Sequence, residues 1–246
     1  MAKSIFLAGA SGVIGRRLAP MLVEAGYRVT GTTRSPERAE SLRRAGVKPV
    51  VVDVFDAVAL RSAVADAAPE VVIHQLTDLV LLTDAATRPE ALERNAHIRT
   101  QGTANLVAAA LMAGARRLIA QSISFVYAPG PEPHRESDVL NNADPRFKRS
   151  VEGIVALERE VTKTPGIDGI VLRYGWFYGP GSGADKPRSR GSVHVDAAAH
   201  AALLAVERGR PGIYNIAEDD GTVSIEKARS EFGFDPAFRS GRSTTP

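Results

Sequence analysis

The chain has 246 residues, of which 44% are hydrophobic and 24% charged, with a net charge of +3 and no cysteine. This balance is typical of a globular protein with one large domain, or with one domain and a small annex. The lack of cysteine excludes disulfides, thiolate nucleophiles and cysteine-ligated metals. Basic and acidic residues are mixed along the chain, so no nucleic-acid partner is expected. No stretch approaches the ~20 apolar residues that span a bilayer, and we expect a cytoplasmic protein without a membrane partner.

Short apolar runs alternate with longer amphipathic segments along most of the chain. The runs predicted to be strands are 4–8, 27–33, 47–53, 70–75, 116–122, 169–174 and 212–218. Valine, isoleucine and leucine dominate these runs with little polar alternation, as in parallel strands buried on both faces. The segments predicted to be helices are 15–26, 36–46, 57–67, 89–115, 150–164, 195–209 and 224–233. Repeated strand–helix units predict an α/β fold built on a doubly wound parallel sheet.

The composition changes after residue 178. Residues 179–192 are rich in glycine, serine and charge, which is typical of a loop. We therefore predict a dinucleotide-binding core over 1–178, a small substrate-side region over 179–238 and a frayed tail over 239–246. Since the substrate-side region is short, its pocket is expected to be open or to be completed by the second copy of a homodimer.

A glycine-rich turn, GASGVIG at 9–15, follows the first predicted strand and precedes a predicted helix. Gly9 permits a tight turn, Gly12 removes a Cβ that would block a pyrophosphate, and Gly15 lets the helix pack closely against the sheet. The N-terminus of that helix offers free N–H groups and a partial positive charge. The turn therefore predicts a dinucleotide site, formed by these glycines together with Ser11, Val13 and Ile14.

Five more segments accompany the G-x-x-G-x-x-G spacing: VDVFD (52–56), NAHIRTQGTANLVAAA (95–110), QSISFVYA (121–128), LRYGWFYGPG (172–181) and VHVDAAAHA (193–201). Together they resemble the extended and atypical short-chain dehydrogenase/reductase families, which include nucleotide-sugar epimerases and dehydratases. The resemblance runs from about Lys3 to about Phe234.

The resemblance implies roles for several residues. Asp53 and Val54 would flank the adenine of the cofactor, and the loop that follows the fourth strand would run over its ribose and phosphates. The cofactor residues implied by this loop and by the later motifs are Gln75, Leu76, Thr77, Ser122 and Tyr174. His74 is expected to be a packed core histidine, and Asn95 to be a structural brace.

The end of the second predicted strand bears on the choice of dinucleotide. An NAD-binding unit usually has an acidic residue there, whereas this chain has Thr33, Arg34 and Ser35. A 2′-phosphate would repel an acid and pair with a guanidinium. We therefore expect NADP in preference to NAD, with Arg38 near enough to help. The alternative is that Arg34 is simply solvated and the site does not discriminate.

The Tyr-x-x-x-Lys pair of the family is absent from this chain. When Glu158 is matched to the family's helix glutamate, the tyrosine and lysine positions fall on Ser150 and Ile154, and Lys148 is the nearest lysine. The resemblance leaves Ser122 and Tyr127, after the fifth strand, as the predicted catalytic residues. A tyrosine without a neighbouring lysine keeps a pKa near ~10, so it can donate a hydrogen bond to a carbonyl but is a poor general base.

Two further motifs depart from the family pattern or add to it. Trp176 stands where many epimerases have asparagine, and we predict that Trp176 and Tyr178 contact a flat, apolar substrate unless Trp176 belongs to the core. Asp196 is expected to be a helix N-cap without a chemical role. The five histidines show no spacing typical of metal ligands.

These observations predict an NADP-dependent oxidoreductase that reduces a small, largely apolar carbonyl compound or activated alkene. A second hypothesis is a dinucleotide-binding sensor or scaffold without catalysis, which the missing Tyr–Lys pair favours. A third is a nucleotide-sugar epimerase or dehydratase with a substituted proton relay. A small-molecule substrate is the partner expected under the first and third hypotheses.

Overall fold

The computed structural model describes residues 3–78 and 87–241. Its centre is a seven-stranded parallel sheet with the strand order β3-β2-β1-β4-β5-β6-β9. The strands are β1 (Ser4–Ala8), β2 (Arg28–Thr33), β3 (Lys48–Val51), β4 (Val71–His74), β5 (Arg117–Ile123), β6 (Asp168–Tyr174) and β9 (Gly212–Ile216). Each of the seven runs predicted to be strands forms one of these strands, so the predicted doubly wound α/β fold is confirmed.

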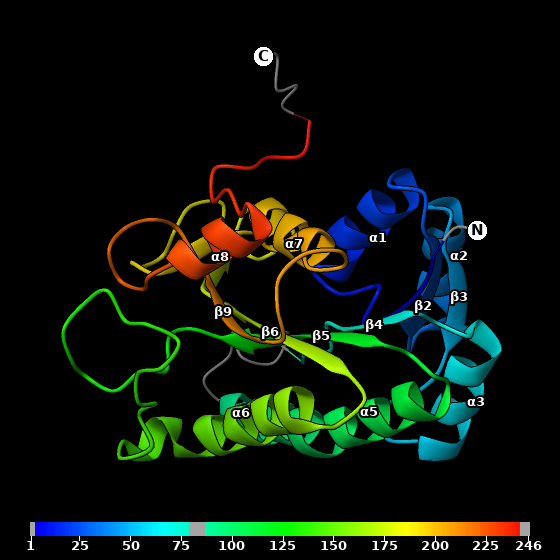
Figure 1. The fold of residues 1–246 in the computed structure, drawn as a ribbon, viewed down its shortest axis with the longest axis horizontal. Coiled ribbons are helices and arrows are strands. Elements are labelled where there is room, and N and C mark those ends of the chain that lie inside the picture. The colour runs from blue at the N-terminus through cyan, green and yellow to red at the C-terminus, as the bar shows by residue number, and fades with distance from the viewer. Residues whose placement is uncertain (1–2, 79–86, 242–246) are drawn as a thin grey trace.

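Helices cover both faces of the sheet (Figure 1). One face carries α1 (Gly15–Glu24), α7 (Val195–Leu204) and α8 (Glu226–Phe232); the other carries α3 (Ala57–Ala67), α5 (Thr103–Met112) and α6 (Pro145–Lys163). α2 (Pro36–Arg44) packs against β2 and β3. Successive side chains of a strand point to opposite faces. Ile5 and Leu7 accordingly join the core under α1 and α7, and Phe6 and Ala8 join the core under α3, α5 and α6.

The predicted helix 89–115 is divided into three parts. It consists of α4 (Arg88–His97), a π-helical turn η2 (Ile98–Gly102) and α5. A π-turn inside a helix is often found at a functional site. Gly102 packs closely on Val54, since a Cβ at this position would lie 3.2 Å from Cγ1 of Val54.

The C-terminal part of the chain shares the core of the N-terminal part. β9 extends the main sheet beyond β6, and α7 packs against α1. A small second sheet joins β7 (Trp176–Tyr178) to β8 (Ser192–His194) in parallel. The region predicted as 179–238 therefore supplies a strand of the main sheet and two of the helices that cover one of its faces.

The tail predicted to be frayed from residue 239 is anchored at its start. Arg239 Nη2 donates a hydrogen bond of 2.8 Å to the Tyr178 hydroxyl, and the Ser240 N–H donates one of 3.1 Å to Asp196 Oδ2. The prediction is wrong for these two residues because their partners lie on distant elements; residues 242–246 lie outside the described part of the chain.

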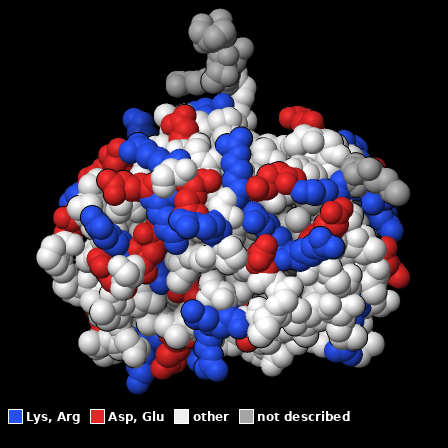
Figure 2. Space-filling model, in the orientation of Figure 1, with Lys and Arg blue, Asp and Glu red and all other residues white. Residues whose placement is uncertain are grey.

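On the face shown in Figure 2, acidic and basic side chains are interspersed. None of the described helices is long and apolar enough to cross a membrane.

Candidate functional site

The glycine turn connects β1 to α1 and sets the shape of the site. Gly9 adopts φ +85°, and a Cβ there would lie 2.7 Å from the carbonyl oxygen of Gln75. A Cβ at Gly15 would collide with the carbonyl oxygen of Gly9, so Gly15 serves the contact of α1 with the turn itself, not with the sheet. The N-cap position of α1 is Ile14, which offers no side-chain cap. The N–H groups of Arg16 and Arg17 already donate to the carbonyl oxygens of Gly12 and Ile14. The N–H groups of Val13, Ile14 and Gly15 have no main-chain partner among the described residues, so they are available to a bound anion.

A cavity of about 510 Å³ opens at the carboxyl ends of β1 to β4, in front of this turn. Eleven of the predicted cofactor residues line it: Gly9, Ser11, Gly12, Thr33, Arg34, Ser35, Asp53, Val54, Gln75, Leu76 and Thr77. Gly12 faces the cavity, and a Cβ there would meet only main-chain oxygens, at 3.2 Å (Gly9) and 4.0 Å (Gln75). The buried Gln75 Oε1 has no hydrogen-bond partner among the described residues. The cavity volume, the glycine cradle and this free acceptor fit a dinucleotide.

Five predicted cofactor residues do not line the cavity: Val13, Ile14, Gly15, Ser122 and Tyr174. The first three form the start of α1. Tyr174 is completely buried, and its hydroxyl accepts a hydrogen bond of 3.4 Å from Gln75 Nε2. Ser122 and Tyr174 are buried where β5 and β6 end, and their contact with the cofactor stays a prediction. The lining residues that the predictions missed are Ala8, Thr32, Val52, Phe55, Leu60, Arg94 and Ile98.

Three arginines gather at the end of the cavity near β2. Arg34, Arg38 and Arg94 all line it, and a second cavity of about 340 Å³ shares Arg34 and Arg94 with the first. Arg94 pairs with Asp78 at 2.8 Å, whereas Arg34 lies 3.8 Å from the same carboxylate and is 55% exposed. The Arg34 guanidinium is therefore available to a ligand. Arg94 lies far from β2 in the sequence, so no local pattern could have assigned it to this site.

Asn95 and His74 hold the chain where it leaves β4. Asn95 Oδ1 accepts from the Asp78 N–H at 2.9 Å, and its Nδ2 donates to the Asp78 carbonyl at 2.8 Å. His74 Nδ1 accepts from the Leu76 N–H at 3.2 Å, so its Nε2 carries the hydrogen and faces Thr103 Oγ1 at 3.1 Å. Burial lowers the pKa of His74 to about 4 and the imidazole is neutral. Both structural predictions are confirmed.

Ser122, one of the predicted catalytic residues, is bound into a buried ion-pair network. Its hydroxyl donates a hydrogen bond of 2.9 Å to Glu158 Oε1. Glu158 also accepts two hydrogen bonds of 2.7 Å from Arg173, whose Nε donates to Oε1 and whose Nη2 donates to Oε2. Ser122, Glu158 and Arg173 are all nearly inaccessible to solvent. Arg173 was missed in the sequence, although an arginine inside an apolar strand is a signal for a buried partner.

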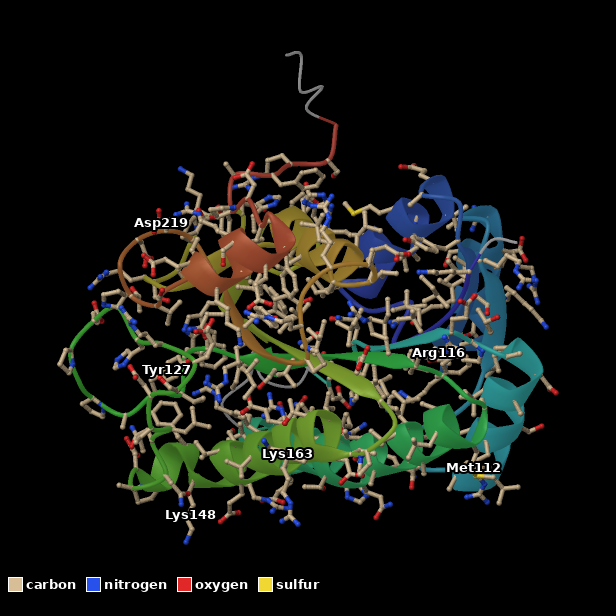
Figure 3. The ribbon with its side chains drawn as sticks, viewed as in Figure 1. Met112, Arg116, Tyr127, Lys148, Lys163 and Asp219 are labelled. Atoms are coloured by element: carbon tan, nitrogen blue, oxygen red, sulfur yellow. The ribbon has the colours of Figure 1, made fainter. Side chains whose placement is uncertain are left out.

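Tyr127, the second predicted catalytic residue, lies at the other end of this network. Its hydroxyl accepts from Arg173 Nη1 at 2.8 Å and donates to Asn215 Oδ1 at 2.7 Å. Burial raises the pKa of Tyr127, although Arg173 opposes this rise. Figure 3 shows Tyr127 on the chain that follows β5, whereas Lys148 points outward from the start of α6. The cation beside this tyrosine is thus Arg173, and Lys148 does not supply the missing lysine.

The positions matched to the family's tyrosine and lysine lie in an apolar environment. Ser150 and Ile154 are both buried, and Ile154 belongs to a cluster with Val126 and Val151.

The segments that follow β5 and β6 carry a hydroxyl group without a hydrogen-bond partner among the described residues and a pair of stacked aromatic rings. Ser124 Oγ is buried and has no partner among the described residues. Trp176 stacks on Phe125 with a centroid distance of 3.5 Å and is 45% exposed, so it is not a core residue. The Tyr178 hydroxyl donates to Glu218 and accepts from Arg239. Burial and the Glu218 carboxylate raise the pKa of Tyr178 to about 12.

The start of α7 differs from the prediction. His194, not Asp196, occupies the N-cap position, and its Nδ1 accepts the Asp196 N–H at 3.1 Å. The Asp196 carboxylate instead pairs with Arg17 of α1 and accepts from the Ser240 N–H. Asp196 therefore bonds to residues that are distant in the sequence and does not cap its own helix. Among the described residues no group of three metal-ligating side chains occurs.

A glycine turn, a cavity at the carboxyl ends of β1 to β4 and the strand order of a dinucleotide-binding sheet define a nucleotide-binding enzyme fold. Residues 5–193 match the family described as the NAD dependent epimerase/dehydratase family. The chain belongs to the NAD dependent epimerase/dehydratase family. Membership in this family supports a nicotinamide cofactor for this chain.

Individual relatives of the family include reductases. A 3-diazoavenalumate denitrifying reductase from a Streptomyces species is 40% identical over 238 residues, covering 88% of this chain and 76% of that protein. A 4-hydroxy-2-methyl-3-oxo-4-farnesyl-3,4-dihydroquinoline-1-oxide ketoreductase from Stigmatella aurantiaca is 24% identical, covering 89% of this chain and 69% of that protein. The UDP-glucose 4-epimerase of Thermotoga maritima, crystallised with UDP-glucose, has the same fold: its TM-score is 0.77 at 19% identity, over 96% of this chain and 94% of that one.

Proposed function

We propose that this chain is an NADP-dependent oxidoreductase that reduces a small, flat substrate. The observation that carries the proposal is the arginine group around the β2 end of the cavity, in which the exposed Arg34 makes only a long ion pair of 3.8 Å with Asp78 and would pair with a 2′-phosphate. Arg38 and Arg94 add positive charge to the same region. The glycine turn and the first turn of α1 would hold the pyrophosphate, and NADPH, when bound, would supply a hydride.

A reductase relative at 40% identity supports reduction as the reaction class. A carbonyl substrate would accept a hydride at carbon and a proton at oxygen. The name of that relative refers to a diazo compound. We therefore propose to screen ketones, enones and diazo compounds as the first substrates. The half-exposed stack of Trp176 on Phe125 supports a planar substrate, for which it offers an apolar surface.

Ser124 is the best-placed hydrogen-bond donor for a substrate oxygen. Its hydroxyl is buried and unpartnered at the carboxyl edge of the sheet, whereas the hydroxyls of Ser122 and Tyr127 already bond to Glu158, Arg173 and Asn215. We retain Ser122 and Tyr127 as proposed residues of the reaction site. Tyr127 can turn its proton toward a substrate only by releasing Asn215, and Arg173 would stabilise the oxygen that remains.

The cofactor proposal is tested by titrating the protein with NADPH and NADH while following cofactor fluorescence. Arg34→Ala is expected to weaken NADPH binding about 10- to 100-fold, the value of a lost charge-assisted contact, and to change NADH binding less than about twofold. Arg44→Ala is the matched control, since Arg44 is exposed on α2 and outside the cavity. Equal affinity of the wild-type protein for both dinucleotides would contradict the NADP preference.

A dinucleotide-binding sensor is the second candidate function. This candidate is favoured because the buried Ser150 and Ile154 stand at the positions matched to the family's tyrosine and lysine, so the usual proton donor is missing. The two candidates differ in turnover: an oxidoreductase consumes NADPH with a member of the substrate panel and loses rate in Ser124→Ala. A sensor binds NADPH without consuming it, whatever substrate is offered.

A further inference from the structure

Two guanidinium groups approach the same carboxylate oxygen where the two cavities meet. Arg94 Nη2 lies 2.8 Å from Asp78 Oδ2, and Arg34 Nη2 lies 3.8 Å from the same atom. Arg34 follows β2 and Arg94 belongs to α4, and both line the cofactor cavity as well as the second cavity. Asp78 comes after β4 and lines the second cavity. A position between two guanidinium groups suits an anion, and in the free protein an internal carboxylate occupies it.

The Asp78 carboxylate is held in place through the main chain of its own residue. The Asn95 side chain accepts the Asp78 N–H and donates to the Asp78 carbonyl, and Asn95 is buried. The Asp78 side chain is 9% exposed, whereas the side chains of Arg94 and Arg34 are 45% and 55% exposed. Asp78 is thus the fixed partner, and the two long, half-exposed arginine side chains can change rotamer around it.

Other acidic side chains do not share the position of this carboxylate. Glu93, which also lines the second cavity, accepts Nε of Arg149 on both of its oxygens, at 3.0 and 2.9 Å. Glu90 pairs within α4 at 3.6 Å and lines neither cavity. Asp53 lines the cofactor cavity, where its Oδ1 accepts a main-chain N–H at 3.0 Å. Among the described residues, Arg34 has no second carboxylate within 4 Å.

We propose that Asp78 is an internal counter-ion of the 2′-phosphate site and sets how strongly the protein prefers NADPH to NADH. This inference rests on the proposed function and names the residue that regulates the cofactor selectivity of that same site. In the free protein the carboxylate neutralises part of the charge of Arg34 and Arg94. A 2′-phosphate, with a charge of about −1.5 to −2, has to draw these guanidinium groups away from it.

The effect of Asp78 depends on the charge of the group that enters the site. Two anions a few ångströms apart repel each other, and more strongly at a partly buried site than in water. Asp78 therefore weakens the binding of a dinucleotide that carries a 2′-phosphate and leaves one with a neutral 2′-hydroxyl nearly unaffected. The acidic residue that is missing at the end of β2 is thus partly replaced in space by one that follows β4.

An isosteric substitution tests the sign of this effect. Asp78→Asn removes the charge and keeps an oxygen for Arg94, and the main-chain bonds to Asn95 need no carboxylate. In titrations followed by cofactor fluorescence, we expect it to tighten NADPH binding by about 3- to 30-fold and to change NADH binding by less than about twofold. Asp66→Asn removes the same charge from an exposed site on α3, outside both cavities, and should change neither affinity by as much as about twofold.

Fragments of the cofactor assign the effect to the 2′-phosphate. 2′,5′-ADP and 5′-AMP differ only in this group, and calorimetric titration measures the binding of both. Asp78→Asn should tighten the binding of 2′,5′-ADP by the same factor as that of NADPH, and should leave the binding of 5′-AMP unchanged. Asp78→Glu keeps the charge and should tighten neither. Asp78→Ala also removes the charge and should tighten 2′,5′-ADP, which decides the question if Asp78→Asn does not fold.

Removal of Arg94 gives an independent readout. Without Arg94 the carboxylate pairs with Arg34 alone, so Arg94→Ala should weaken NADPH binding. The double variant with Asp78→Asn should recover part of this loss, because Arg34 is then released to the phosphate. If Asp78 only held the arginines in position, the double variant would bind NADPH no better than Arg94→Ala does, and the inference would fail.

The outcomes separate this inference from the proposed function. Weaker or unchanged NADPH binding in Asp78→Asn would overturn the inference, and so would equal tightening in Asp66→Asn, which would reflect net charge alone. Both results leave the proposed function in place if the wild-type protein prefers NADPH. If only Asp78→Asn prefers NADPH, the preference proposed for the wild-type protein fails and the inference stands. If neither protein binds NADPH or 2′,5′-ADP, both fail.

Discussion

The residues proposed for the reaction site have hydrogen-bond partners that differ from those in the family pattern. The positions of the tyrosine and lysine are filled by Ser150 and Ile154, and a buried arginine, Arg173, is the cation beside Tyr127. Ser122 and Tyr127 could be found in the sequence because Ser122 ends a predicted strand and Tyr127 follows it. Their bonds to Arg173 and Glu158 could not, since α6 and β6 bring these partners together from distant positions.

Glu158 should be important for stability because it is the only carboxylate seen to pair with Arg173 in the described structure. Glu158→Ala would leave the guanidinium buried without its partner, and removal of one member of a buried pair costs about 3–5 kcal/mol. Urea denaturation measures the free energy of unfolding. Glu160→Ala, on the same helix and without a described ion pair, is expected to change it by less than about 0.5 kcal/mol. Similar small effects for both variants would contradict this account of the network.

At the level of elements, the turn between β1 and α1 combines two kinds of glycine. Gly15 serves packing, because a Cβ there would collide with the carbonyl oxygen of Gly9. Gly12 serves the cavity, because its missing Cβ leaves room in front of the turn. The sequence predicted both roles, but only the structure shows that the close contact of Gly15 is with the turn.

Substitution by alanine should separate these roles. Gly12→Ala is expected to weaken NADPH binding by about tenfold or more, the free energy of about one lost contact. It should lower the melting temperature less than Gly15→Ala does, because its Cβ would lie 3.2 Å from the carbonyl oxygen of Gly9, with which a Cβ at Gly15 would collide. Gly15→Ala should lower the free energy of unfolding by about 1–3 kcal/mol, as overpacking does, and should weaken NADPH binding as well. Calorimetric melting together with cofactor titration would reveal the two patterns. Identical profiles for the two variants would argue against the division.

At the scale of the whole molecule, His74 makes the free energy of unfolding depend on pH. It lies on the central strand β4, 1% exposed, and its pKa of about 4 is below the 6.5 of a free imidazole. Between pH 4 and pH 6.5 the imidazole of His74 is mostly protonated in the unfolded chain but mostly neutral in the folded protein. The contribution of His74 to stability is therefore complete above pH 6.5 and decreases as the pH falls toward 4.

The expected size of this effect is about 3 kcal/mol, at 1.36 kcal/mol for each pH unit. We predict that the free energy of unfolding of His74→Gln falls less steeply with acid than that of the wild-type protein, by about this amount. Denaturation in urea at a series of pH values from 7 to 4 measures both slopes. His97→Gln, exposed on α4, should keep the wild-type slope. A wild-type slope in His74→Gln would assign the acid sensitivity to other groups.

The sequence by itself determined the seven strands, the glycine turn and the charged end of β2, because these depend on local patterns of apolar residues, glycine and charge. It also excluded a tyrosine–lysine pair. Only the tertiary structure decided which polar groups meet: Arg94 joins Arg34 at the cavity, and Arg173 meets Glu158. Whether a buried group is satisfied depends on elements that are distant in the sequence, so spacing alone cannot determine it.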